Sequence, residues 1–285
     1  MTAIALTPEK FAAAAERLPT TPQIFSRLSS AMKNPDISVE EIVSVVQLDA
    51  SLSARVLRLS NSAQYGRGGS VADLTEAINR TGFQEVYRLV GAAMSSQLYI
   101  TGLPVYGIGG DELWSNSLTA AVALEHLSDA TGEDRRVGYT LGLLRSVGRL
   151  LLQRLAAGAL VPPLSGRKAT AVLVDAWERE TFGITSAEAA ERLFALWRFP
   201  ARLADPIQFQ FKPSAAPQRV RFAALLHIAG YIAEKLDRSI PIEKNAWALD
   251  EEILLMAGLD ADAVESCLEK TRSGAGQMES MMRAA

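Results

Sequence analysis

Apolar residues recur through most of the chain at the three- and four-residue spacing of amphipathic helices, and no stretch shows the strict alternation of a strand. This pattern predicts an all-α protein. The predicted helices span residues 75–81, 83–98, 111–130, 134–156, 167–182, 186–197, 201–208 and 218–236. Residues 250–270 are expected to form two short helices around Gly258. Residues 273–285 carry no core pattern and are expected to fray.

Helix-start signals predict further helices in the N-terminal part of the chain. Thr7 and Thr21 each precede a proline, which is favoured in the first turn of a helix because its missing N–H is not needed there. Ser38 is followed three residues later by Glu41, which is the spacing of a capping box. Asp49 precedes another apolar run and is expected to cap the helix that contains it.

The most apolar of the predicted helices carries two polar residues near its centre. Between residues 139 and 153 the sequence is apolar almost all round, as in a helix that is buried on several sides. Arg145 and Ser146 interrupt this run. Because a buried guanidinium is costly unless it is paired, we expect Arg145 to have a specific partner.

Several stretches resemble the HDOD family, the HD-related output domains. They are Leu-Pro-Thr-Thr-Pro at 18–22, Ile-Val-Ser-Val-Val at 42–46, Asp-x-Ser-Leu-Ser-Ala-Arg-Val-Leu-Arg-Leu-Ser-Asn-Ser-Ala at 49–63, and Gly-Phe-x-x-Val at 82–86. The pattern Gly-Leu-Leu-x-x-x-Gly-Arg-Leu-Leu-Leu within 139–153 also resembles the central helix of HD-superfamily domains.

The resemblance covers residues 18–236 and implies a bacterial, all-helical signalling domain. We expect an N-terminal helical subdomain at 1–105, packed on a degenerate HD-like helical subdomain at 106–240. A C-terminal helical extension is expected at 241–285.

Metal ligands are replaced at every position where the resemblance would place them. In HD hydrolases, histidine and aspartate side chains on neighbouring helices hold a divalent ion that activates water. The corresponding positions here are Asn116, Arg145, Ser146, Ser186, Gln210, Phe211 and Gly230. Arg145 also places a permanent positive charge where the cation would sit. We therefore predict no metal, no cofactor and no metal-dependent phosphohydrolase activity.

Two interpretations of Arg145 remain open. In the first, Arg145 pairs with a carboxylate such as Glu180 or Glu188 and plugs the former metal site. In the second, the donors of Arg145 bind a nucleotide or another anion in a polar pocket. That pocket would be lined by Asn116, Arg145, Ser146, Ser186, Gln210 and His227. The sequence has only two histidines, and His227, on an apolar helix, is expected to be a hydrogen-bonded core residue.

Composition narrows the classes of partner. The formal net charge of −3 over 285 residues gives no general attraction to nucleic acid or to an anionic membrane. The single cysteine, Cys267, cannot form an internal disulfide, which fits a reducing compartment, and we expect it to pack in the core. The sequence shows neither a signal peptide nor an apolar run long enough to span a bilayer. We therefore expect a cytoplasmic protein that does not bind membranes.

Other motifs have weaker functional interpretations. Residues 38–62 could form a helix-turn-helix, but the acidic pair Glu40-Glu41 and the overall charge favour a core helix pair, so we predict no DNA binding. The glycine-rich stretches 66–69 and 107–110 neither follow a strand nor end in Gly-Lys-Ser/Thr, which indicates loops rather than phosphate cradles. The aromatic-rich stretch 194–211 is expected to be core, or the border of a protein-binding surface.

These observations predict a non-enzymatic output or scaffold module of bacterial signal transduction that acts through protein–protein contacts. We expect its partner to be a signalling protein. We expect no attached receiver or cyclic-nucleotide enzyme domain, and we therefore expect the input to come from a partner or a ligand. The main alternative is a small-molecule receptor that uses the Arg145 pocket, and a metal-dependent phosphohydrolase is the least favoured hypothesis.

Overall fold

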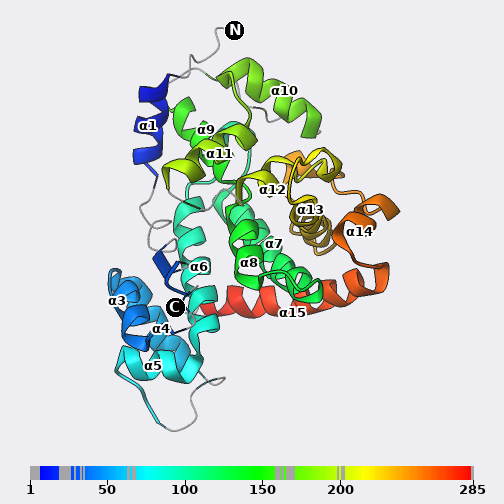
Figure 1. The fold of residues 1–285 in the computed structure, drawn as a ribbon. Helices are drawn as coiled ribbons and strands as arrows, with labels where there is room; N and C mark the ends of the chain where they lie inside the picture. The colour runs from blue at the N-terminus through cyan, green and yellow to red at the C-terminus, as the bar shows by residue number, and fades with distance from the viewer. Residues whose placement is uncertain are drawn as a thin grey trace. The chain divides into compact units, whose positions relative to one another are not determined.

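The described part of the chain consists mainly of helices (Figure 1). The computed structural model describes residues 7–18, 27–28, 30–32, 34, 36–62, 65, 69–157, 161, 164, 171–197, 199 and 203–283. These residues contain no strand, only an isolated antiparallel bridge between Leu103 and Ile108. The all-α prediction is confirmed. In the described part of the chain, no helix combines the length and the apolar character that crossing a membrane requires.

The described residues belong to two compact units. The large unit lies within Met1–Pro19 and Leu98–Ala275, and the small unit lies within Thr20–Gln97 and Gly276–Ala285. The subdomain boundaries predicted after residues 105 and 240 stay predictions.

The small unit begins its regular structure at capping residues that the sequence identifies. Its helices are α3 (Val39–Val46), α4 (Ala50–Ser60), α5 (Leu74–Thr81) and most of α6 (Phe83–Tyr99). The Ser38 hydroxyl accepts the backbone N–H of Glu41, and Asp49 accepts that of Leu52. Both predicted starts are confirmed, whereas the start predicted at Thr21 lies outside the described residues.

The C-terminal helix corrects one prediction. α15 (Ala261–Arg283) continues through the segment that was expected to fray. Met278 and Met282, one helical turn apart, are buried, and the carbonyl of Met282 accepts a hydrogen bond of 3.3 Å from Arg55. The prediction of fraying was wrong because two methionines and one long-range contact anchor a segment whose own sequence lacks a broad apolar stripe.

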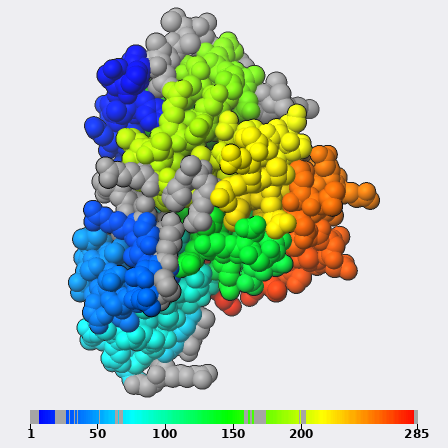
Figure 2. Space-filling view, viewed as in Figure 1, coloured from blue at the N-terminus to red at the C-terminus, as the bar shows by residue number. Residues whose placement is uncertain are grey.

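The large unit contains the candidate site. Its elements are α1 (Pro8–Glu16), η1 (Pro104–Tyr106), α7 (Gly110–Ala130), α8 (Arg135–Leu144), α9 (Val147–Ala156), α10 (Ala171–Phe182), α11 (Ser186–Leu196), α12 (Ala204–Gln208), η3 (Pro213–Ala215), α13 (Val220–Lys235), η4 (Pro241–Glu243), α14 (Glu251–Ala257) and the first part of α15. α7 packs against both α8 and α13, and α9 packs against α11. Figure 2 shows the orange segment that holds α14 at the surface, beside the yellow segment that precedes α13.

The helix predicted over 134–156 is two helices. α8 ends at Leu144 and α9 begins at Val147, so the chain turns at the two polar residues that interrupt the apolar run. Ser146 has φ −104° and ψ 7°, outside the α-helical range, and this ends the regular hydrogen bonding of α8. The predicted starts at residues 167 and 201 lie outside the described residues.

Two glycines let the backbones of neighbouring helices touch. A Cβ atom at Gly142 on α8 would lie 2.3 Å from the Cα of Ala121 on α7. A Cβ atom at Gly148 on α9 would lie 1.7 Å from the carbonyl oxygen of Ser186 on α11. These close approaches hold α8 against α7 and α9 against α11, on the two sides of the turn that carries Arg145.

Candidate functional site

Arg145 is buried at the turn between α8 and α9, and protein groups contact its guanidinium through every nitrogen. Nε donates to the side-chain oxygen of Gln210 at 3.3 Å, and Nη1 donates to that of Asn116. Nη2 donates to Oε2 of Glu243 at 2.5 Å. The ring of Trp247 lies 4.9 Å from its Cζ atom. Three of the five N–H donors of Arg145 therefore have acceptors inside the protein.

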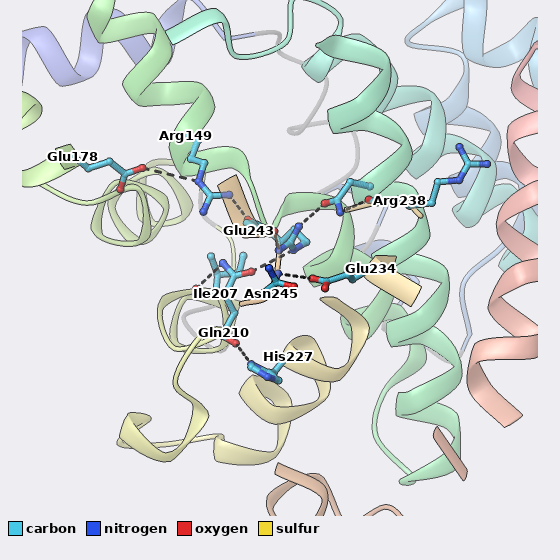
Figure 3. Close-up of polar contacts among 11 residues, drawn as sticks. Arg149, Glu178, Ile207, Gln210, His227, Glu234, Arg238, Glu243 and Asn245 are labelled. Atoms are coloured by element: carbon cyan, nitrogen blue, oxygen red, sulfur yellow. Dashed lines mark hydrogen bonds and ion pairs between the residues drawn. The ribbon is translucent and has the colours of Figure 1, made fainter. Parts of the chain in front are cut away.

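Glu243, at the end of η4, bridges two arginines (Figure 3). Its Oε2 atom accepts from Arg145, and its Oε1 atom accepts from Nη1 of Arg149. Nε of Arg149 lies 4.0 Å from Oε1 of Glu178 on α10. The four side chains alternate in charge and are all buried. We call them the ion cluster: Arg145, Glu243, Arg149 and Glu178.

The two carboxylates of the ion cluster differ in their electrostatics. Burial alone raises the pKa of Glu243, but the guanidiniums of Arg145 and Arg149 outweigh it and hold this pKa below its ordinary value. Burial raises the pKa of Glu178 above its ordinary value, and Arg149 offsets this only in part. Burial also lowers the pKa of Arg149, yet Glu243 and Glu178 raise it overall. Glu243 is therefore the main counter-ion of the two arginines.

Glu178 reaches the rest of the unit through uncharged donors. The phenol of Tyr106 donates to Oε1 at 2.8 Å, and the backbone N–H of Ser186 donates to Oε2 at 2.6 Å. Burial, reinforced by the nearby charge of Glu178, raises the pKa of Tyr106 well above its ordinary value, so this phenol stays a donor. The cluster thereby links η1, α9, α10, α11 and η4.

Glu243 comes from the segment between α13 and α14, residues 237–249, which we call the connector. At its start, the carbonyl of Arg238 accepts from Nδ2 of Asn116 at 2.7 Å. The backbone N–H of Asn245 donates to Glu234 on α13 at 3.1 Å (Figure 3). Asp237 and Asn245 have φ of 56° and 62°, so left-handed residues stand on both sides of Glu243.

Trp247 of the connector fills the space beside a glycine of α13. Its ring stacks on Phe211 with centroids 4.6 Å apart, and the ring of His227 meets its face edgewise at 5.3 Å. A Cβ atom at Gly230 would lie 2.5 Å from the indole. The position where the resemblance expects the last aspartate ligand thus holds a glycine that makes room for an aromatic ring.

His227 is a hydrogen-bonded core residue. Its Nδ1 atom lies 2.8 Å from the carbonyl oxygen of Gln210, and its Nε2 atom lies 2.8 Å from that of Ala248. Both ring nitrogens therefore contact backbone acceptors, and the interpretation of His227 as a packed histidine is confirmed. Cys267 is also buried, as expected, and burial raises the pKa of its thiol.

The six residues of the predicted pocket are brought together only in part. Asn116 and Gln210 touch Arg145, and His227 joins them through the backbone of Gln210. The Ser146 hydroxyl is buried and makes no hydrogen bond within the described residues. Ser186 uses its backbone, with its N–H on Glu178. Because the side chain of Arg145 is fully buried, an anion would have to enter the core and compete with these internal acceptors.

Arg145 pairs with a carboxylate, as predicted, but the residues named for this role, Glu180 and Glu188, were wrong. Glu243 takes this role, whereas Glu188 pairs with Arg179 at 3.0 Å and caps α11 through the backbone N–H of Thr185. Arg149 was overlooked although it follows Arg145 by only four residues in the sequence. Trp247 and Glu243 had no such signal, because they lie about a hundred residues away in an irregular segment.

The donor set at this site does not suit a metal ion. Within the described ranges, no three His, Cys, Asp or Glu side chains are grouped as metal ligands would be. The two carboxylates of the ion cluster, Glu243 and Glu178, face the guanidiniums of Arg145 and Arg149, which repel a cation.

Comparison with known proteins identifies relatives of the whole fold. The sequence profile of the HDOD domain matches residues 18–213. An uncharacterized protein of Treponema pallidum (strain Nichols) is 23% identical over 239 residues, which are 82% of this chain and 46% of that protein. The chain thus spans about half the length of this curated relative.

Solved structures share the helical arrangement. A candidate signal transduction protein of Marinobacter aquaeolei VT8 is similar with a TM-score of 0.68 and 20% identity, over 95% of this chain and 65% of that one. A candidate phosphohydrolase of Shewanella amazonensis SB2B is similar with a TM-score of 0.65 and 26% identity, over 95% of this chain and 96% of that one.

Proposed function

Because the chain belongs to the HDOD family, we propose that it is a non-enzymatic signal-transduction module that acts through contacts with a partner protein. The observation that carries this proposal is the ion cluster. Where the HD resemblance expects ligands of a divalent ion, Arg145 and its partner Glu243 form a buried, internally paired group. A fixed guanidinium at that place opposes the binding of a cation that would activate water.

Because a similar structure is that of a candidate phosphohydrolase, metal-dependent hydrolysis is the competing hypothesis that the first experiment tests. The test measures hydrolysis of bis-p-nitrophenyl phosphate and of cyclic dinucleotides by the purified chain, with Mn²⁺, Fe²⁺ or Zn²⁺ added. We expect no turnover above that of the Arg145→Ala variant, which serves as the matched control. Turnover that depends on the metal and on intact wild-type protein would overturn the non-enzymatic assignment.

A separate experiment tests the proposal that the chain acts through contacts with a partner protein. Crosslinking and affinity capture of the tagged chain in its native cells, followed by binding measurements with the purified candidate, should give a direct complex. A chain that binds no protein, and is instead stabilised in thermal shift by a nucleotide, would favour the receptor hypothesis.

A further inference from the structure

We propose that the Arg145–Arg149 pair and the ring of Phe211 form a docking site for an acidic, aromatic-bearing peptide segment, and that Glu243 and Trp247 of the connector occupy this site as an internal ligand. This inference rests on the proposed function, because it names the chemistry by which a partner protein would be recognised. The inference goes beyond the proposed function in one respect: the partner and the connector compete for the same site.

The two arginines form the part of the site that binds the carboxylate of the ligand. Each carboxylate oxygen of Glu243 accepts from a different guanidinium, so one carboxylate satisfies both cations. The side chains of Arg145 and Arg149 are 0% and 5% exposed. If Glu243 left, two buried positive charges would lack their main counter-ion, which creates a strong demand for another carboxylate.

The aromatic half lies beside the arginines. The indole of Trp247 stacks on Phe211 with an interplanar angle of 29°. The guanidinium of Arg149 lies over the ring of Phe211, with its Cζ atom 5.8 Å from the centroid of that ring. A flat ring on Phe211 and a carboxylate on the arginines are therefore the two features that a ligand must supply.

The connector is held by the side chains of Glu243 and Trp247 and by some of its backbone groups. The carbonyls of Arg238 and Ala248 contact Asn116 and His227, and the backbone N–H of Asn245 donates to Glu234. Apart from η4 the connector contains no helix, and the backbone N–H groups of Glu243 and Ala246 donate within the connector itself, each at 3.0 Å. Asp237 and Asn245 have left-handed backbone conformations, which Asp and Asn adopt more readily than other residues except glycine. A segment with these properties can leave without breaking a helix or sheet ladder.

The packing favours replacement of the connector by an incoming peptide over departure of the connector alone. Ile240 and Ile242 of the connector are also buried, so its departure without a replacement would expose apolar surface and unpaired charge. A peptide that brings its own carboxylate and ring replaces these anchors as it enters. The present occupant is itself a peptide with Glu243 and Trp247 four residues apart, which favours a peptide over a nucleotide as the competing ligand.

The first test uses a fluorescein-labelled peptide of residues 238–250 as the probe. The full chain with Glu243→Ala and Trp247→Ala, in which both anchors are removed, should bind it at least about ten-fold more tightly than the wild type does in anisotropy titrations. The same peptide with Glu243→Gln and Trp247→Ala is the control and should not bind. Equal binding of both peptides, or binding of neither, overturns the proposal.

The second test uses the wild type and therefore does not depend on whether that variant folds. Hydrogen exchange at the amides of Glu243 and Ala246 should be faster than in the centre of α13, and an excess of unlabelled peptide should increase it further. Exchange of connector and α13 at one common rate means that the connector leaves only on global unfolding, and this result overturns the proposal.

The outcomes separate this inference from the proposed function. Release of the bound probe by millimolar nucleotide but not by unlabelled peptide assigns the site to a nucleotide and overturns the peptide assignment. If a partner protein binds the wild type and the Glu243→Gln variant with the same affinity, the proposed function stands. The docking-site proposal is then overturned. Metal-dependent hydrolysis would end the proposed function itself.

Discussion

At the scale of single residues, the fold depends on one carboxylate that neutralises two buried arginines. Glu243 is about as buried as a side chain can be, with 1% exposure, and it faces Arg145 and Arg149. Removing one member of such a group leaves charges that neither water nor protein compensates. Glu243 is therefore expected to contribute far more to the free energy of unfolding than an exposed carboxylate in a similar pair.

Replacement of Glu243 by glutamine should lower the free energy of unfolding by about 3–5 kcal/mol, because the amide keeps the shape and loses the charge. Urea denaturation followed by circular dichroism measures this change. Glu269→Gln is the matched control, since Glu269 forms an exposed pair with Arg272, and its effect should stay below about 1 kcal/mol. Equal effects of the two substitutions would contradict the assigned role of Glu243.

Gly230→Ala tests the contact between α13 and Trp247. The new methyl group would overlap the indole, so the free energy of unfolding should fall by about 1–3 kcal/mol. The substitution Trp247→Leu opens space at the same place. A double-mutant cycle should therefore give a favourable coupling, whereas strictly additive effects would mean that the two positions do not meet.

At the scale of the elements, glycine determines how closely α9 approaches α11. Gly148 faces a backbone carbonyl, which cannot rotate away as a side chain can. We expect Gly148→Ala to lower the free energy of unfolding by about 3 kcal/mol while the far-ultraviolet spectrum stays helical. Gly276→Ala on α15 is the control: its Cβ meets nothing within 4 Å, and it should stabilise by up to about 1 kcal/mol. A neutral Gly148→Ala would contradict the close packing.

The sequence predicts the helices well and the site only in part. The helices α7, α11 and α13 follow from apolar periodicity and caps, which are local signals. The break at Ser146 was overlooked because leucines continue on both sides of it. Glu243 could not be paired with Arg145 from the sequence, because the pairing is decided by the path of an irregular connector and not by any local pattern.

At the scale of the whole molecule, the ion cluster makes stability depend on pH. The pKa of Glu243 is lower in the folded protein than its ordinary value of 4.5, so its contribution is complete above that value and is lost as the pH falls through the folded pKa. The difference in unfolding free energy between wild type and Glu243→Gln should therefore shrink as the pH falls below 4.5. Denaturation curves from neutral to acidic pH measure it, and a constant difference would contradict the ionised state of Glu243.

The guanidinium of Arg145 has a further consequence at this scale. A scaffold closed by a divalent ion owes part of its cohesion to whatever trace elements its surroundings provide. Here the positive charge that contacts Asn116 of α7 and Glu243 of η4 is covalently part of the chain. Neither starvation for trace elements nor a chelating agent can remove this charge from the core.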